Sequence, residues 1–242
     1  MMYETPQSTP QFALVTGGAK RLGRAIALEL ARAGWSIVLH CRNSLAEARQ
    51  TASEIEALGV GCVVVQADLE NPDEVEALFD EAERVGPVRC VVNNASLFEF
   101  DSGETFKPAL FHRHMASNLA APIQLAGRLF QHVPDQEQAV VVNLLDQKLK
   151  NLNPDFLSYT LTKAGLETAT TMLAMELAPK VRVVGVAPGL TLISHLQTDA
   201  QFEQTHRISP LNKSSEPQDI ANTVLFLVQS RAITGTTILV DG

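Results

Sequence analysis

The chain has 242 residues, of which 45% are hydrophobic and 19% are charged, and this composition excludes disorder as the main state. Its 27 acidic and 19 basic residues give a formal net charge of −8 without a basic cluster, so nucleic acid is not an expected partner. No apolar run approaches the roughly 20 residues that cross a bilayer, so no membrane segment is expected.

The first residues differ in character from the rest of the chain. Residues 1–10 are polar and contain proline, with neither the basic nor the apolar region of a secretory signal, so we expect a flexible N-terminal arm. The cysteines Cys41, Cys62 and Cys90 lie in or beside apolar runs and form no C-x-x-C pair. This pattern favours buried free thiols and a cytoplasmic protein.

Short apolar runs alternate with amphipathic segments from residue 11 to residue 242. The apolar runs predict strands at residues 12–16, 36–39, 62–66, 89–93, 139–144, 181–186 and 237–240. The amphipathic segments predict helices at residues 22–33, 45–58, 72–85, 112–131, 159–177 and 217–228. Most strand candidates are apolar on both faces, which is typical of a parallel sheet covered by helices on both sides. We therefore expect a single α/β domain with a Rossmann-type, doubly wound, parallel, seven-stranded sheet.

One long polar stretch, residues 190–215, interrupts this alternation. A connection of that length inside a domain is usually functional, so we expect a substrate lid, in which His195 and His206 lie. His112 and His114 are separated by one residue in a predicted helix and point in different directions. No third ligand accompanies them, so no metal site is expected.

A turn rich in small residues follows the first predicted strand and opens the first helix. Residues 16–23 read TGGAKRLG. Small residues let the backbone approach a pyrophosphate closely, and the N–H groups of the helix N-terminus attract it. The turn predicts a phosphate site, with a purely structural tight turn as the alternative. The expected cofactor-binding residues here are Gly17, Lys20, Arg21, Leu22 and Gly23.

The end of the second strand indicates which nicotinamide cofactor binds. NAD-binding folds place an Asp or Glu there for the ribose hydroxyls, but this chain has no acid until Glu47. Arg42 and Ser44 instead suit a 2′-phosphate, so NADPH is the expected cofactor. The expected phosphate-binding cluster is His40, Arg42, Asn43 and Ser44. The alternative is a surface arginine followed by a helix cap at Asn43 or Ser44.

A phenol and an ammonium group are four residues apart in the predicted helix at residues 159–177. Tyr159 and Lys163 therefore lie on one helix face. The lysine can act there on both the pKa of the tyrosine and the ribose of a cofactor. A Tyr-x-x-x-Lys pattern also arises by chance, so its surroundings decide its meaning.

These motifs, in this order, resemble the short-chain dehydrogenase/reductase family from Phe12 to the C-terminal Val-Asp-Gly. The resemblance implies that Asp68 and Leu69 contact the adenine, with a helix cap as the alternative for Asp68. It implies further cofactor contacts from Asn94, Ala95, Ser96, Tyr159, Lys163, Pro188 and Gly189. It also implies Asn118 as a further catalytic residue and a homotetramer formed through the helices that carry Asn118 and Tyr159.

Two departures from the family pattern and one aromatic residue resemble its pteridine reductase branch. Arg21 replaces a glycine, Asp146 replaces the serine 13 residues before Tyr159, and Phe98 follows Ser96 at the position that stacks on a pterin. The alternatives are a solvated loop carboxylate at Asp146 and an ordinary apolar residue at Phe98. The implied substrate-binding residues are Arg21, Ser96, Phe98, Asp146, Tyr159, Gly189 and Leu190.

The exchange at Asp146 has a physical rationale. A nearby carboxylate raises the pKa of a phenol, which favours a protonated Tyr159 that donates a proton. The expected activity is NADPH-dependent reduction of a dihydropterin to a tetrahydropterin, with oxidised pterins and folates as further candidates. The expected catalytic group is Asp146, Tyr159, Lys163 and Asn118. The alternatives are a carbonyl reductase, such as a 3-oxoacyl-thioester reductase, and an NADPH-binding regulator without turnover.

Overall fold

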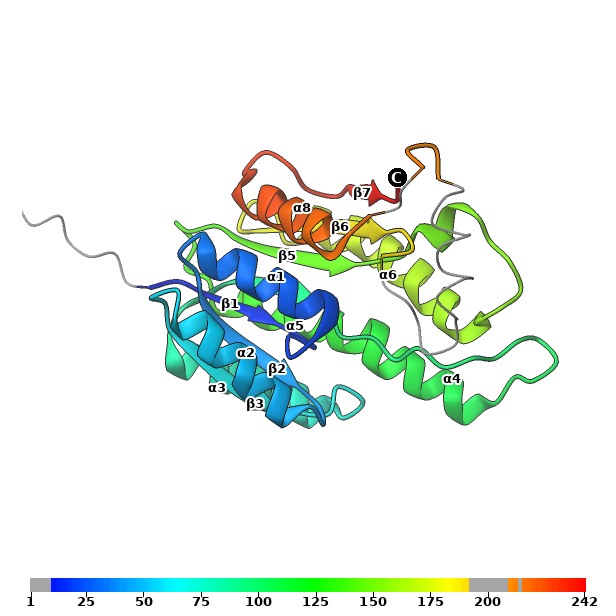
Figure 1. Ribbon diagram of the computed structural model, residues 1–242, viewed down its shortest axis with the longest axis horizontal. Coiled ribbons are helices and arrows are strands. Elements are labelled where there is room, and N and C mark those ends of the chain that lie inside the picture. Colours follow the sequence, from blue (N-terminus) through cyan, green and yellow to red (C-terminus); the bar gives the residue numbers. More distant parts are fainter. Residues whose placement is uncertain (1–9, 192–208, 213–214) are drawn as a thin grey trace, which may run out of the picture.

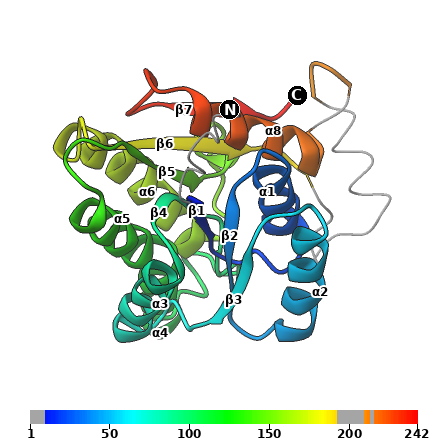
Figure 2. The same ribbon diagram turned by 90° about the vertical axis from the view of Figure 1, so that its left-hand side faces the viewer.

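Seven parallel strands form the central sheet in a computed structural model, which describes residues 10–191, 209–212 and 215–242. In chain order they are β1 (Phe12–Val15), β2 (Ser36–Cys41), β3 (Cys62–Gln66), β4 (Val88–Asn93), β5 (Ala139–Leu144), β6 (Val181–Pro188) and β7 (Thr237–Val240). Their spatial order, β3-β2-β1-β4-β5-β6-β7, runs outward in both directions from β1 and β4 (Figure 1, with β4 labelled in Figure 2). Folds of this order bind ligands beyond the carboxyl ends of the strands, at that switch point.

Helices cover both faces of the sheet, as Figure 2 shows. One face carries α1 (Arg21–Arg32), α2 (Leu45–Glu56) and α8 (Pro217–Gln229). The other carries α3 (Pro72–Val85), α5 (Ala121–His132) and α6 (Leu157–Glu176). Among the described residues, the remaining helical segments are α4 (Pro108–Met115) and the short helices η1 (Ala116–Ala120) and η2 (Gln147–Lys150). The predicted fold class, a doubly wound parallel sheet, is confirmed.

The strands are apolar at successive positions because both of their faces are buried. In β1, Ala13 and Val15 belong to the apolar layer beneath α1 and α8. Phe12 and Leu14 belong to the layer beneath α3 and α5, and all four side chains are buried. Successive side chains of a strand point to opposite faces, so two helix layers require apolar residues at every position.

Two helical segments begin two or more residues before their predicted starts. The segment predicted as one helix at residues 112–131 begins earlier, at Pro108, where the missing N–H of a proline does no harm. Its middle is a π-helical turn, η1, which the apolar pattern did not indicate. Helix α6 begins at Leu157, before the predicted start at Tyr159, because a carboxylate outside the helix caps it.

One expectation about the cysteines is wrong. Cys41 and Cys90 are buried, but Cys62 is half-buried because β3 is an edge strand. Residues 1–9 and most of the predicted lid, with His195 and His206, lie outside the described residues. No helix in the described ranges is long and apolar enough to span a membrane.

Candidate active site

The turn between β1 and α1 packs closely on itself and on the segment after β4 because it contains glycines. A Cβ atom on Gly17 would lie 3.1 Å from the Cα of Ala95, and one on Gly23 would lie 2.2 Å from the Gly17 carbonyl oxygen. Lys20 at the N-cap of α1 makes no side-chain capping bond, and the first turn of the helix has no acidic residue. The N–H groups and positive dipole end of α1 are thus suited to a diphosphate.

Arg21 has the backbone conformation that favours the glycine it replaces. Its φ angle is +54°, in the left-handed region where a side chain introduces strain. Such strain is retained mainly at functional sites. Arg21 and Leu22 line the cavity described below, together with Asp146, Tyr159 and Lys163.

His40 lies beneath the glycine-rich turn rather than on its surface. Its Nδ1 accepts a hydrogen bond from the Gly17 N–H at 3.0 Å, and its Nε2 lies 3.0 Å from the Ala67 carbonyl oxygen. Burial lowers the pKa of His40, which favours a neutral ring with its proton on Nε2. Because both ring nitrogens are used within the protein, His40 supports the turn instead of offering its ring to a phosphate.

Arg42, at the end of β2, is exposed and holds two carboxylates. Its guanidinium lies 2.9 Å from Asp68 Oδ2 and 2.8 Å from Glu70 Oε1. Glu70 also pairs with Arg113 at 2.9 Å, and the hydrogen bond from Arg113 lowers the pKa of Glu70. The sequence analysis missed Glu70 and Arg113 because their contacts join distant segments. Arg42 is held where the adenosine end of a cofactor would lie in this fold.

The helix-cap alternatives near Arg42 have different outcomes. Asn71, rather than Asp68, caps α3, because its side chain accepts a hydrogen bond from the Asp73 N–H at 3.1 Å. Asp68 instead accepts from the Glu70 N–H at 3.0 Å. Ser44 is the N-cap residue of α2, but its side chain makes no capping hydrogen bond. Helix capping therefore does not use its hydroxyl.

The end of β4 is tied to the same turn. The Thr16 hydroxyl oxygen accepts hydrogen bonds from the N–H groups of Asn94 and Ala95, both at 3.0 Å. The Asn94 amide donates to the carbonyl oxygens of Thr16 at 2.9 Å and Gly17 at 3.1 Å. Asn94 and Ser96 line the cavity, so this segment forms a wall of the site beside the turn.

The predicted reacting groups meet at the carboxyl end of β5. The Tyr159 hydroxyl donates a hydrogen bond to Asp146 Oδ2 at 2.7 Å. Asp146 Oδ1 accepts from the Lys148 N–H at 2.8 Å, which fixes the carboxylate at the start of η2. Lys163 Nζ donates to the Leu144 carbonyl oxygen at 2.6 Å and lies 5.7 Å from the centre of the Tyr159 ring. Asp146 is therefore a partner of the phenol and not a solvated loop carboxylate.

Burial shifts the pKa values of both groups on α6. The pKa of Tyr159 is raised, first by burial and then by the charge and hydrogen bond of Asp146. Burial lowers the pKa of Lys163 to about 8, although Asp146 opposes that change. At neutral pH Tyr159 is thus a protonated phenol and Lys163 an ammonium group. The sequence analysis expected the effect of Asp146 on Tyr159 but missed the larger effect of burial.

Asn118 lies in the π-helical turn, and its amide is used within the protein. Its Oδ1 accepts from the Leu97 N–H at 2.7 Å, and its Nδ2 donates to the Leu97 carbonyl oxygen at 2.9 Å. Nδ2 also donates to the Thr162 hydroxyl at 3.3 Å. Asn118 therefore joins the segment after β4 to α6, close to the reacting groups.

A cavity of about 460 Å³ joins these elements at the carboxyl edge of the sheet. Its lining comprises Arg21, Leu22, Asn94, Ser96, Phe98, Leu144, Leu145, Asp146, Tyr159, Lys163, Pro188, Gly189, Leu190 and Thr191. The Phe98 ring stacks on Phe156 with centroids 4.3 Å apart and meets Tyr159 edge-on at 4.8 Å. The sequence analysis missed Phe156, which lies in a polar loop without an apolar pattern.

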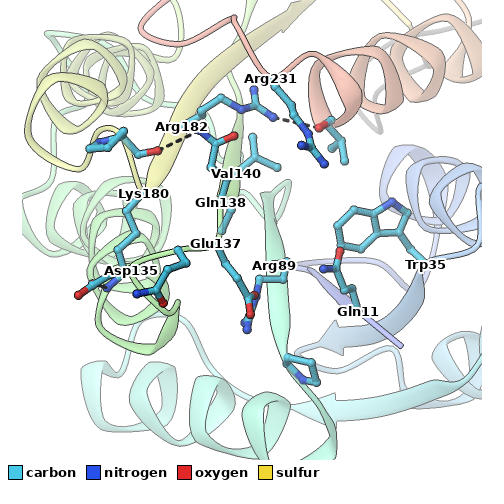
Figure 3. Close-up of a pocket in the computed structure, with 15 residues that line it drawn as sticks. Gln11, Trp35, Arg89, Asp135, Glu137, Gln138, Val140, Lys180, Arg182 and Arg231 are labelled. Carbon is cyan, nitrogen blue, oxygen red and sulfur yellow. Dashed lines mark hydrogen bonds and ion pairs between the residues drawn. The ribbon is translucent and has the colours of Figure 1, made fainter. Parts of the chain in front are cut away.

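A larger cavity, about 830 Å³, lies at the opposite edge of the sheet (Figure 3). Its buried cations are bound to the protein itself. Arg182 donates to the carbonyl oxygens of Leu227, Val228 and Ile233, and Arg89 pairs with Glu137 at 2.5 Å. Cavity size therefore does not decide between the two cavities, and the carboxylate, phenol, ammonium and aromatic groups of the smaller one make it the candidate active site.

Comparison with known proteins agrees with this arrangement. Residues 11–204 match the model of a family described as short chain dehydrogenase. The chain belongs to this family of oxidoreductases. The chain is 32% identical over 237 residues to the 3-oxoacyl-[acyl-carrier-protein] reductase FabG of Staphylococcus epidermidis, which covers 95% of this chain and 97% of that protein.

Solved structures of similar proteins add to this comparison. FolM alternative dihydrofolate reductase 1 from Brucella canis, complexed with NADP, is 40% identical and superposes with a TM-score of 0.92, covering 98% of this chain and 95% of that one. The angucycline C-6 ketoreductase LanV with bound NADP is 31% identical, with a TM-score of 0.87 over 95% of this chain and 93% of that one. The similarities include both a dihydrofolate reductase and carbonyl reductases.

Proposed function

We propose that this short-chain oxidoreductase uses NADPH to reduce dihydropterins to tetrahydropterins, with oxidised pterins and folates as further candidate substrates. The observation that carries the proposal is the hydrogen bond from the Tyr159 phenol to Asp146 beside a cavity with an aromatic wall. The similarity to FolM supports the substrate class.

The cofactor is NADP, as in the similar FolM and LanV structures. The N-terminus of α1, which has no side-chain capping bond and no acidic residue in its first turn, fits its diphosphate. Arg42 and Ser44 would hold the 2′-phosphate, with His40 supporting the turn. Pro188 and Gly189 in the cavity wall would lie against the nicotinamide. The cofactor supplies a hydride when bound.

Tyr159 would deliver the proton of the reduction. A pterin C=N bond would gain a hydride on carbon from the cofactor, and the electron pair of its π bond would take a proton onto nitrogen from the Tyr159 hydroxyl. The raised pKa keeps the phenol protonated until the nitrogen becomes strongly basic. The fixed Asp146 carboxylate orients the phenol, and solvent then restores its proton.

Lys163 would support this step by charge. Its ammonium group lies 5.7 Å from the ring centre of Tyr159, so it stabilises the tyrosinate that remains after proton transfer. Its donation to Leu144 fixes the side chain against β5, where it can also bind the cofactor ribose. Asn118 would act on the same site by holding Leu97 and Thr162 in place.

The aromatic wall suits a flat substrate. Phe98 packs on Phe156 through one face, and stacking between aromatic rings adds about 0.5–1.5 kcal/mol beyond area burial. Arg21, Ser96, Gly189 and Leu190 line the same cavity and would contact the rest of the pterin.

A carbonyl reductase is the second candidate, and a specific observation favours it. FabG and LanV, which are 32% and 31% identical to this chain, are a 3-oxoacyl-thioester reductase and a ketoreductase. Asp146 opposes this candidate, because it stands where the family resemblance implies a serine. An NADPH-binding regulator without turnover is the third, and the assembled Asp146, Tyr159 and Lys163 group opposes it.

NADPH oxidation distinguishes these functions. The assay uses dihydrobiopterin, dihydromonapterin, dihydrofolate and an acetoacetyl thioester, with Tyr159→Phe as the inactive control. We expect turnover of at least one dihydropterin with a kcat/KM above that for the thioester. No turnover of any pterin would refute the proposal, and activity with the thioester alone would establish the carbonyl reductase.

We further propose a cytoplasmic homotetramer assembled through α5 and α6. Apolar side chains on these helices face solvent in the single chain, with exposed fractions of 38% for Ile123, 64% for Met172 and 79% for Met175. Met175→Glu should convert a tetramer into smaller species in analytical ultracentrifugation. A wild-type monomer at micromolar concentration would refute the assembly.

A further inference from the structure

Asp101 is a buried carboxylate that has no part in the site as described so far. It lies on the loop after β4 and is only 1% exposed. Within the described ranges of the chain it makes no ion pair, and its partner is instead Ser158, in the first turn of α6. Oδ1 accepts from the Ser158 N–H at 2.9 Å, and Oδ2 accepts from the Ser158 hydroxyl.

Helix α6 needs this external acceptor because its own N-cap residue has none. Phe156 occupies the N-cap with φ 55° and ψ 50° and makes no side-chain capping bond. The first N–H groups of a helix lack acceptors within the helix, and a carboxylate there also interacts favourably with the helix dipole. Asp101 thus caps α6 from a different segment, and its backbone carbonyl accepts from the Leu157 N–H at 3.2 Å as well.

The cap connects the segment that carries Phe98 to the helix that carries Tyr159, and both residues line the candidate active-site cavity. Tyr159 directly follows Ser158, and Phe98 lies three residues before Asp101 on the capping loop. The loop is held at its other end by the hydrogen bonds between Asn118 and Leu97. Between these two attachments Phe98 stacks on Phe156 and contacts the Tyr159 ring.

We infer that Asp101 is a positioning residue that fixes the Tyr159 phenol relative to the Phe98 wall. It does not reach the cavity lining, so it acts through the first turn of α6. The inference rests on the proposed role of Tyr159 as proton donor. A displacement of about 1 Å at a reacting group can lower a rate by about 100-fold, so loss of the cap should act mainly on kcat.

Asp101→Ala should lower kcat about 10- to 100-fold, while the NADPH Kd stays within about two-fold of wild type. Asp101→Asn should restore most of the rate, because an amide oxygen also accepts from the Ser158 N–H. Asn71→Ala is the matched control: it removes the cap of α3, away from the cavity lining, and should lower thermal stability without changing kcat.

A wild-type kcat in Asp101→Ala would overturn the inference, as would an equal loss of kcat in Asn71→Ala. If Asp101→Ala does not fold, the test uses Ser158→Ala instead. We expect a several-fold fall in the kcat of that variant, and an unchanged kcat would contradict the inference. All variants are assayed with dihydropterin and with the acetoacetyl thioester. If wild type reduces only the thioester, the proposed function fails, and Asp101 is then judged on its kcat for that substrate.

Discussion

The two edges of the central sheet both bury ionisable side chains, but they use them differently. At the amino-terminal edge, Arg182 donates to backbone carbonyl oxygens and Arg89 pairs with Glu137, so both cations are saturated by the protein (Figure 3). At the carboxyl edge, Asp146 and Tyr159 bond to each other while lining a cavity. The larger cavity lies at the first edge and the reactive groups at the second, so available chemistry identifies the site better than volume.

The largest effect should come from Tyr159, at the carboxyl edge. Tyr159→Phe keeps the ring that contacts Phe98 but removes the proton, so kcat for dihydropterin should fall about 1,000-fold. Stopped-flow NADPH oxidation measures the rate, and thermal unfolding should show an intact fold. A kcat within ten-fold of wild type would contradict the assignment of proton donation to Tyr159 at the carboxyl edge.

At the amino-terminal edge we expect a substitution to lower stability and to leave kcat unchanged. Arg182→Met leaves the carbonyl oxygens of Leu227, Val228 and Ile233 without this donor, so the free energy of unfolding should fall by about 2–4 kcal/mol. Urea unfolding measures this loss, with the exposed Arg49→Met as the control. Below the unfolding midpoint kcat should equal that of wild type, and a kcat reduced without loss of stability would assign this edge a functional role.

A substitution of Arg42 tests whether the proposed cofactor site at the carboxyl edge of the sheet extends to the end of β2. Arg42→Ala should raise the Kd of NADPH about ten-fold, because a charge-assisted bond to phosphate is worth at least about 1.5 kcal/mol. The Kd of NADH should hardly change, since NADH lacks the 2′-phosphate. Fluorescence titration measures both constants. An equal loss for the two cofactors would show that Arg42 acts through its partners Asp68 and Glu70 instead.

The smallest effect concerns pH. The pKa of Lys163 is lowered from 10.5 to about 8, so the ammonium is charged below pH 8 and neutral above it. The Kd of NADPH should therefore rise a few-fold as pH increases through about 8, and Lys163→Arg should remove this dependence. A flat wild-type profile would contradict the shifted pKa.

The same shift has a defined sign for stability. Between pH about 8 and 10.5 the unfolded chain binds more protons at Lys163 than the native chain does. The free energy of unfolding contributed by this group therefore rises across that window and is lowest below it. Lys163→Met, which has no titrating group, should lose this part of the pH dependence in urea unfolding.

Much of the fold was predictable because its signals are local. Strands buried on both faces are mostly apolar at successive positions, and β1 is apolar at all four. The helix signals were local too: Gly34 follows α1 with a φ of +91°, and Pro72 begins α3. The π-helical turn has no such local signal, so the break between α4 and α5 was not predicted.

The candidate site was predictable where its groups lie in motifs of fixed spacing, such as Asp146, Tyr159 and Lys163. Asp101, Phe156 and Glu70 were missed for a physical reason. The partners Asp101 and Ser158 are 57 residues apart, and Glu70 and Arg42 are 28 apart. Only the folded sheet and its helices bring such segments together.

The most direct test of the account is the pH profile of kcat/KM for dihydropterin in Asp146→Ser compared with wild type. Removal of the carboxylate should lower the pKa of Tyr159, shift the alkaline limb of the profile to lower pH, and reduce kcat/KM at neutral pH about ten-fold or more. Unchanged activity with an unchanged profile would contradict the claim that Asp146 and Tyr159 act together as the proton-donating group.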